Sequence, residues 1–237
     1  MKHGVFSIDL VLIMITILSI FPYIFFKVRN KVPYPVKSTL KLEDYYILSI
    51  LLTYIVMGGY QQYFWTKDNM LTDAITVPLT YLDTLIEKND WWVYIYNFIY
   101  YIIFGFVLVS IKDYKHFVLL ISGAFLLMSG LSIIWYCIPN ITPERMKTNK
   151  YILSKTQKID NNKNNACPSA HVVFSVYSYY LLRHVIGEFY AIMIPIIISL
   201  SCLKTSQHVF LDVLFGIIYT YLVYNFVLKK VNPKIFT

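Results

Sequence analysis

The sequence predicts an all-α fold, a polytopic transmembrane helical bundle with six or seven spans. Hydrophobic residues make up 57% of the 237 residues and charged residues only 14%, whereas soluble domains average about 25% charged residues. Long uncharged stretches alternate with lysine-rich ones, such as the segment 27–31. A soluble protein of this size would lack the charge to cover its surface, and a bilayer removes that requirement.

Seven apolar stretches approach the length of about 20 residues that a helix needs to cross a bilayer. They are Val5–Phe26, Tyr45–Trp65, Trp91–Ile111, Phe117–Ile138, His171–Ile186, Phe189–Leu203 and Val209–Leu228. The fifth and sixth are short and share the tight turn 183–188, so they are compatible with a helical hairpin within the membrane. The first has no small-residue cleavage site, and its basic cluster follows it, which favours a retained span over a cleaved signal peptide.

Two connections between the predicted spans are long. Thr66–Asp90 carries acidic residues with apolar residues between them at loosely helical spacing, which predicts a short amphipathic element on the membrane surface. Pro139–Pro168 is polar and contains the low-complexity tract 160–165, which is typical of a flexible segment.

Composition argues against several other classes of protein. The net charge of +8 is spread over short basic clusters between apolar stretches, whereas nucleic-acid binding requires a basic stripe on one folded face. We therefore expect no nucleic-acid partner. The three cysteines, Cys137, Cys167 and Cys202, lack CxxC spacing, which argues against a disulfide framework or a zinc site. We predict no metal and no cofactor, because Asp160 and the other scattered carboxylates form no metal-binding pattern with the histidines and no glycine-rich nucleotide loop is present.

The segment that opens the last span carries Lys204, His208 and Asp212 at intervals of four residues. On a helix these side chains would stack along one face. An aspartate one turn from an imidazole can accept its Nδ1 proton, which leaves Nε2 free to attack an electrophile. The pattern predicts a histidine nucleophile with its orienting carboxylate. A histidine–aspartate pair that only satisfies its own hydrogen bonds explains these residues equally well.

The segment that opens the fifth predicted span begins with Pro168. Proline suits the first helical turn because it lacks an N–H group that would have no partner there. Ser169 and the small Ala170 would then present backbone N–H groups at a helix start, where a phosphate can bind. If the hairpin forms, His171 lies at the same membrane level as His208. That coincidence favours a functional pair over two unrelated interfacial histidines.

Together these segments resemble the last two signature motifs of the type 2 phosphatidic acid phosphatase and haloperoxidase superfamily. Pro168-Ser169-x-His171 is followed by Ser201-x(6)-His208-x(3)-Asp212, and the resemblance covers the chain from about Trp135 to Gly216. It implies a phosphohistidine mechanism. By resemblance, His208 is the nucleophile, Asp212 its orienting partner and His171 the general acid, while Ser169 helps to bind phosphate.

The family also has an earlier basic motif, and its nearest counterpart here ends at Arg145. The stretch 139–145 is similar to the Pro-x-x-x-Pro-Arg segment of the inositol-phosphorylceramide-synthase-like branch, with one inserted acidic residue. Arg145 is therefore expected to clamp phosphate in a bidentate way, although a solvated loop charge would also explain it. The arginine usual six residues before the nucleophile is replaced by Cys202, and Lys204 is expected to supply the missing charge.

The resemblance implies an integral membrane phosphatase that hydrolyses a lipid phosphate monoester or diphosphate, with a membrane lipid as substrate and the bilayer as its setting. Residues 1–237 would form one membrane domain, with N-terminal spans in 5–111 and a catalytic core at about 135–228. Two alternatives stay open. A phosphotransferase of the same architecture would pass a phospho-headgroup to an alcohol instead of water. A transporter or non-catalytic bundle would use His208 and Asp212 to relay protons.

Positive charge in the loops suggests an orientation for the bundle. The basic residues are nearly balanced between the two sides when every loop is counted. Most of those on one side lie in the single long loop Pro139–Pro168, and when this loop is discounted its side carries few positive charges. We therefore expect that side, and the active site with it, to face away from the cytoplasm.

Overall fold

The computed structural model describes residues 23–24, 26–27, 39–97, 107, 110–143, 151–159 and 165–231. This part of the chain is mostly helical, with 75% helix and few strand residues. The prediction of a helical fold is thereby confirmed, apart from two strands of two residues each.

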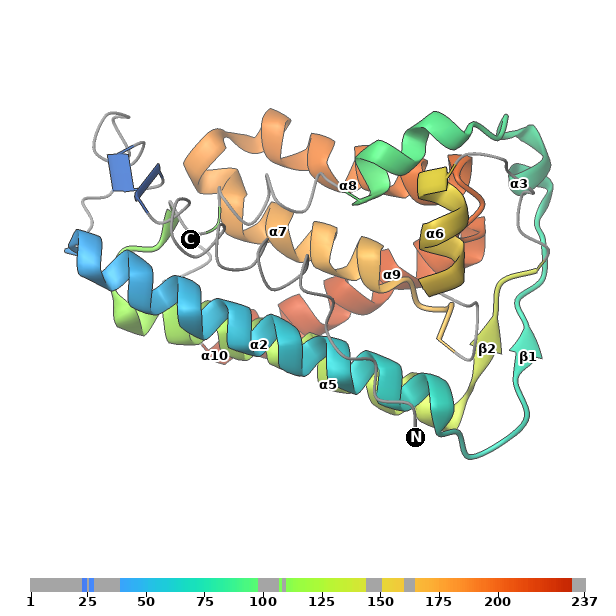
Figure 1. Cartoon of the computed structure of the whole chain (residues 1–237), viewed down its shortest axis with the longest axis horizontal. Coiled ribbons are helices and arrows are strands. Elements are labelled where there is room, and N and C mark those ends of the chain that lie inside the picture. Colours follow the sequence, from blue (N-terminus) through green and yellow to red (C-terminus); the bar gives the residue numbers. More distant parts are fainter. Residues whose placement is uncertain are drawn as a thin grey trace.

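The long helices run roughly side by side, and the strands lie at one end of the molecule together with the short helices α3 and α6 (Figure 1). The helices are α2 (Leu42–Asp68), α3 (Tyr81–Leu85), α5 (Tyr114–Cys137), α6 (Tyr151–Ile159), α7 (Ala170–Ile186), α8 (Glu188–Lys204), α9 (Phe210–Val223) and α10 (Lys229–Val231), with the 3-10 helix η1 (Asp90–Trp92) and the π-helix η2 (Tyr224–Leu228). Strands β1 (Ile75–Thr76) and β2 (Asn140–Ile141) pair in parallel.

Two helical stretches of the described residues are long and apolar enough to cross a bilayer, Tyr114–Cys137 and Phe210–Leu228. Helices α7 and α8 have 17 residues each, slightly fewer than the roughly 20 that a span needs. The predicted span Val5–Phe26 lies largely outside the described residues, and Trp91–Ile111 lies partly outside them. The count of six or seven spans therefore stays a prediction.

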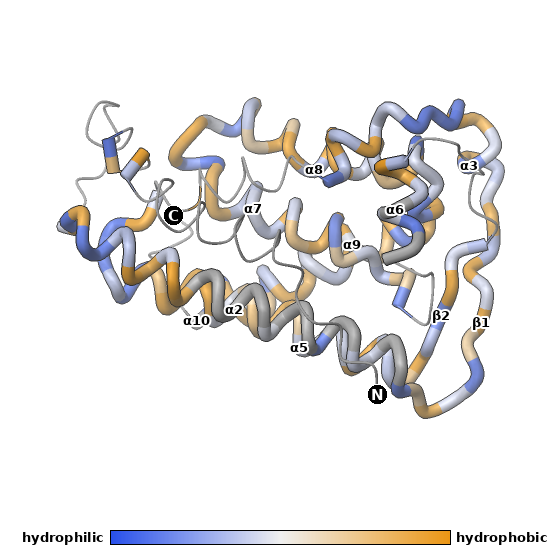
Figure 2. The backbone as a smooth tube through the Cα atoms, viewed as in Figure 1, coloured by the Kyte–Doolittle hydropathy of each residue, from blue (hydrophilic) through white to orange (hydrophobic). Residues whose placement is uncertain are grey.

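Large apolar side chains are exposed on the outer faces of these helices. Examples are Phe125 and Ile133 on α5 and Phe215 on α9. Figure 2 shows hydrophobic residues spread along the long helices. Exposed apolar surface on this scale is unusual for a soluble monomer.

Helices α7 and α8 form the helical hairpin that the sequence predicts. A single residue joins them, Gly187, whose φ of 88° is rarely adopted by residues that carry a Cβ atom. The two helices have equal length, so the chain returns to the level at which α7 began (Figure 1). The first residue of α7 and the last residue of α8 therefore lie at the same end of the hairpin.

A buried apolar core forms where α5, α7, α8 and α9 meet. Its members include Leu127, Leu131, Trp135, Val172, Val176, Ile198 and Val213. Helix α9 packs closely against the start of α7 at Gly216, where a Cβ atom would lie 3.1 Å from Cβ of Val172 and 3.2 Å from the carbonyl oxygen of Ser169. The absence of a side chain at Gly216 lets the two helices meet at this level.

The connection Thr66–Asp90, for which the spacing predicts a short amphipathic surface element, contains strand β1 and the short helix α3. Helix α2 continues to Asp68, and β1 and the five-residue α3 follow. Asp83 on α3 is buried, because its carboxylate accepts hydrogen bonds from the backbone N–H groups of Thr80 (2.8 Å) and Phe210 (2.7 Å). The carboxylate of Asp83 thus ties α3 to the first residue of α9.

Candidate active site

His208 lies in a short loop between α8 and α9. Helix α8 ends in a Schellman motif, in which the N–H of Ser206 donates to the carbonyl of Leu203 and the N–H of Gln207 donates to that of Cys202, each at 3.1 Å. Ser206 adopts the left-handed conformation that this motif requires, with a φ of 55°. The motif reverses the chain and places His208 just before the next helix.

The expectation that Lys204, His208 and Asp212 stack along one helix face is wrong. The chain leaves the helical path after Lys204, and a new helix begins only at Phe210. The spacing of four residues between His208 and Asp212 instead joins a loop residue to the first turn of α9.

The histidine–aspartate pair nevertheless forms as the sequence analysis expects. Nδ1 of His208 lies 3.2 Å from Oδ2 of Asp212, and both side chains are buried. The same carboxylate oxygen accepts the N–H of Val209 at 3.0 Å, which fixes its orientation. A carboxylate at Nδ1 favours the tautomer that carries its proton there, so Nε2 is the nitrogen with a free lone pair.

The structure brings the second histidine beside the first. The ring centroids of His171 and His208 are 5.8 Å apart. Nδ1 of His171 lies 3.1 Å from the hydroxyl of Tyr96, and the two rings stack with their centroids 4.2 Å apart. Tyr96 thus fixes the orientation of the His171 ring beside His208. Sequence reasoning missed Tyr96, which lies among the aromatic residues that open the third predicted span.

The start of α7 differs in two details from the sequence expectation. Helix α7 begins at Ala170 with Ser169 as its N-cap, so Pro168 precedes the first turn, after a cis peptide bond with Cys167. The N–H of Ser169 is not free, because it donates to the carbonyl of Asp212 at 3.0 Å. The Ser169 hydroxyl is buried and has no hydrogen-bond partner within the described part of the chain.

Strand β2 and the residue after it fasten both motif segments. The side-chain amide of Asn140 donates to the carbonyl of Cys167 at 2.7 Å, and the Thr142 hydroxyl donates to the carbonyl of Gln207 at 3.2 Å. Burial raises the pKa of the Cys167 thiol to about 12, and the nearby Asp212 carboxylate adds to this effect. Cys167 is therefore held as a neutral thiol beside the site.

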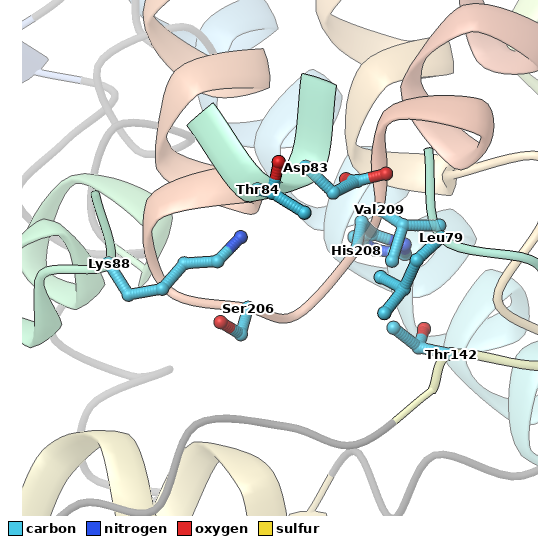
Figure 3. Close-up of a pocket in the computed structure, with 8 residues that line it drawn as sticks. All are labelled: Leu79, Asp83, Thr84, Lys88, Thr142, Ser206, His208 and Val209. Atoms are coloured by element: carbon cyan, nitrogen blue, oxygen red, sulfur yellow. The ribbon is translucent and has the colours of Figure 1, made fainter. Parts of the chain in front are cut away.

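A cavity of about 150 Å³ opens next to His208 (Figure 3). It is lined by Leu79, Asp83, Thr84, Lys88, Thr142, Ser206, His208 and Val209. These residues come from three segments that are far apart in the chain, and His208 is the predicted site residue among them. Lys88 and Asp83 bring charge to the cavity wall, and neither lies in a motif that the sequence reveals.

The two cations predicted to bind phosphate have different outcomes. Arg145 lies outside the described residues. The ammonium of Lys204 donates to the carbonyl of Glu87 at 3.4 Å and lies 5.7 Å from the ring centroid of Trp92, and Lys204 does not line the cavity. Cys202, at the position of the usual arginine, is fully buried.

The comparisons with known proteins agree with the position of the motifs. Residues 137–236 match the family model of the PAP2 superfamily, and this range contains both histidines and Asp212. Members of this superfamily are phosphatases or related phosphoryl-transfer enzymes. The comparisons with curated proteins and with solved structures gave no match. Residues 137–236, which carry both sequence motifs, are therefore similar to the PAP2 superfamily.

Proposed function

We propose that this chain is an integral membrane phosphatase that hydrolyses a lipid phosphate monoester or diphosphate through a phosphohistidine on His208. One observation carries the proposal. Two imidazoles from separate segments have ring centroids 5.8 Å apart, and one of them is bound to a buried carboxylate. Such a pair suits a nucleophile and a proton donor on opposite sides of one phosphoryl group.

In the proposed reaction, Nε2 of His208 attacks phosphorus while the bond from phosphorus to the leaving oxygen breaks. Asp212 holds the ring and stabilises the positive charge that develops on it. His171, in its protonated form, donates its Nε2 proton to the leaving oxygen. The hydroxyl of Tyr96 accepts a hydrogen bond from Nδ1–H and so keeps the other proton in place. Water then attacks the phosphohistidine, His171 takes its proton, and inorganic phosphate is released.

We assign the binding of the phosphate oxygens to the start of α7 and to Arg145. Ser169 contributes a buried hydroxyl that lacks a partner among the described residues. The backbone at Ala170 begins a helix of 17 residues, whose N-terminus favours an anion. Arg145, which follows β2 in the sequence, is proposed as a clamp. These groups would replace water around the dianion at little cost in reorganisation.

The membrane setting is part of the proposal. The apolar stretches Tyr114–Cys137 and Phe210–Leu228 and the exposed apolar side chains support it. We infer that residues 1–237 form a single membrane domain of six or seven spans, with the site facing away from the cytoplasm. A lipid substrate could then reach His208 while its tails stay in the bilayer.

The proposal is tested with the purified full chain in lipid vesicles. Phosphatidate and an isoprenoid diphosphate are supplied with a chelator present, and released phosphate is measured. We expect turnover by the wild type and almost none by His208→Ala, while His171→Ala slows formation of an acid-labile phosphoenzyme. Activity that survives both substitutions rejects the mechanism. Labelled phosphate that appears in a new phosphodiester, when an alcohol is added, identifies a phosphotransferase instead.

A further inference from the structure

The cavity beside His208 contains a cation that belongs to neither PAP2 motif. We propose that Lys88 binds the phosphate of the substrate, in place of the arginine that is missing at Cys202. This inference rests on the proposed function. It assigns a binding role to a residue outside the matched range 137–236.

Three hydrogen bonds attach the segment 87–89 to the end of α8. The ammonium of Lys88 donates to the carbonyl of Leu203 at 3.2 Å. The N–H of Asn89 donates to the carbonyl of Lys204 at 2.8 Å, and the ammonium of Lys204 donates to the carbonyl of Glu87 at 3.4 Å. The segment therefore lies against the last turn of α8, directly after Cys202, which occupies the position of the usual arginine. This helix end leads into the loop that carries His208.

The ammonium of Lys88 has donors to spare. An ammonium carries three N–H groups, and Leu203 accepts one hydrogen bond from it. Within the described ranges, no carboxylate forms an ion pair with Lys88. Asp83 shares the cavity wall, but Oδ1 accepts the N–H of Phe210 and Oδ2 accepts both the N–H and the hydroxyl of Thr80. The acceptor positions of Asp83 are thus largely occupied by neutral donors.

The side chain of Lys88 points into the cavity. Figure 3 shows it extended from the wall into the space between Thr84 and Ser206. His208 lines the same cavity, so an anion within it can contact both the cation and the nucleophile. Burial lowers the pKa of Lys88, and the charge of Asp83 offsets this only in part. Partial burial removes water that would otherwise stabilise the charge of Lys88, and no carboxylate in the described ranges forms an ion pair with it. An anionic ligand would supply that stabilisation.

Lys204 is the contrasting case at the same end of α8. Its ammonium lies over the ring of Trp92 and donates to the carbonyl of Glu87. It therefore holds in place the segment that carries Lys88, whereas Lys88 itself reaches the cavity. The sequence expectation of a compensating lysine near Cys202 is retained in the proposal, with a different residue in that role.

The test compares four variants of the full chain in lipid vesicles. Lys88→Met removes the charge and the donors, and Lys88→Gln keeps a donor for the Leu203 carbonyl without the charge. Lys88→Arg keeps the charge. Lys115→Met is the control, because Lys115 is exposed at the start of α5 and lies outside the cavity. For each we measure kcat/KM for phosphate release and the inhibition constant of inorganic phosphate, and gel filtration reports folding.

We expect Lys88→Met and Lys88→Gln to lower kcat/KM, and to raise the inhibition constant of inorganic phosphate, by about 10- to 100-fold, the usual effect of losing a charged hydrogen bond. Lys88→Arg should retain most of the kcat/KM and most of the affinity for inorganic phosphate. Lys115→Met should match the wild type in both quantities. If the wild type is active and His208→Ala is not, but Lys88→Gln binds inorganic phosphate as tightly as the wild type, the inference is wrong and the proposed function stands. A wild type that neither releases phosphate nor binds it overturns both.

Discussion

Replacing Tyr96 with phenylalanine tests whether His171 is the proton donor. Phenylalanine keeps the ring that stacks on His171 with centroids 4.2 Å apart, and removes only the hydroxyl 3.1 Å from Nδ1. A hydrogen bond to a charged group contributes about 1.5–3 kcal/mol. If the protonated His171 loses that bond, kcat should fall roughly 10- to 150-fold, while the packing of the buried ring is preserved.

The assay compares two leaving groups on the same enzyme. An alkyl phosphate has a poor leaving group that needs a proton, whereas a nitrophenyl phosphate leaves readily without one. Tyr96→Phe should therefore lose much more activity on the alkyl phosphate than on the aryl phosphate. Tyr94→Phe is the matched control, because Tyr94 is exposed and stacks on Trp91 instead. An equal loss on both substrates, or no loss, would refute the role given to His171.

Three further predictions concern the surroundings of the site. Ser206→Gly should raise, and Ser206→Val lower, the free energy of unfolding by about 1 kcal/mol, because φ is 55° there; thermal unfolding in detergent checks this, and a valine variant as stable as the glycine variant contradicts it. Gly216→Ala should lower the free energy of unfolding by about 1–3 kcal/mol and reduce kcat, since the added Cβ meets Val172 and Ser169 at 3.1–3.2 Å. Adding Val172→Ala to this variant should recover part of the stability. If the effects of the two substitutions on the free energy of unfolding simply add, the contact is contradicted. Maleimide should label the exposed Cys137 before Cys167, whose thiol has a pKa of about 12; mass spectrometry after timed labelling checks the order, and early modification of Cys167 would be the contrary result.

The helices of the C-terminal half follow closely from the sequence. The predicted stretches Phe117–Ile138 and His171–Ile186 correspond to α5 (Tyr114–Cys137) and α7 (Ala170–Ile186). Long apolar runs bounded by polar residues leave little choice of element. The pairing of His208 with Asp212, and the approach of His171, also agree with the expectation. The motif residues adjoin helix ends that the hairpin brings to one level.

The loop that carries His208 could not be predicted in the same way. The left-handed position of a Schellman motif is usually occupied by glycine, which makes the motif recognisable in a sequence. This chain has Ser206 at that position. Without that signal, the spacing of Lys204, His208 and Asp212 looked like one continuous helix. The helix ends because the carbonyls of Cys202 and Leu203 accept hydrogen bonds from the N–H groups of Gln207 and Ser206 in the turn that follows. Asp212 lies in the first turn of a separate helix, where it accepts the N–H of Val209.

The residues that reach the site from the N-terminal half were also beyond local patterns. Tyr96 lies in an aromatic-rich stretch, where an interfacial anchor is the ordinary explanation of a tyrosine. Lys88 and Asp83 lie in the connection Thr66–Asp90, whose spacing predicts only a short surface element. Their positions depend on hydrogen bonds to Leu203 and Phe210, more than 100 residues later in the chain. Contacts of such long range leave no periodic trace in the sequence.

Helices α7 and α8, of equal length and joined by Gly187, require a set number of residues between the two histidines if both are to lie at the same end of the hairpin. At 1.5 Å per residue, each arm of 17 residues measures about 26 Å. One extra residue in a single arm would advance its end by about 1.5 Å and rotate it by about 100°, turning one imidazole away from the other. The number of residues between His171 and His208 is therefore constrained, even at positions where one apolar residue can be replaced by another.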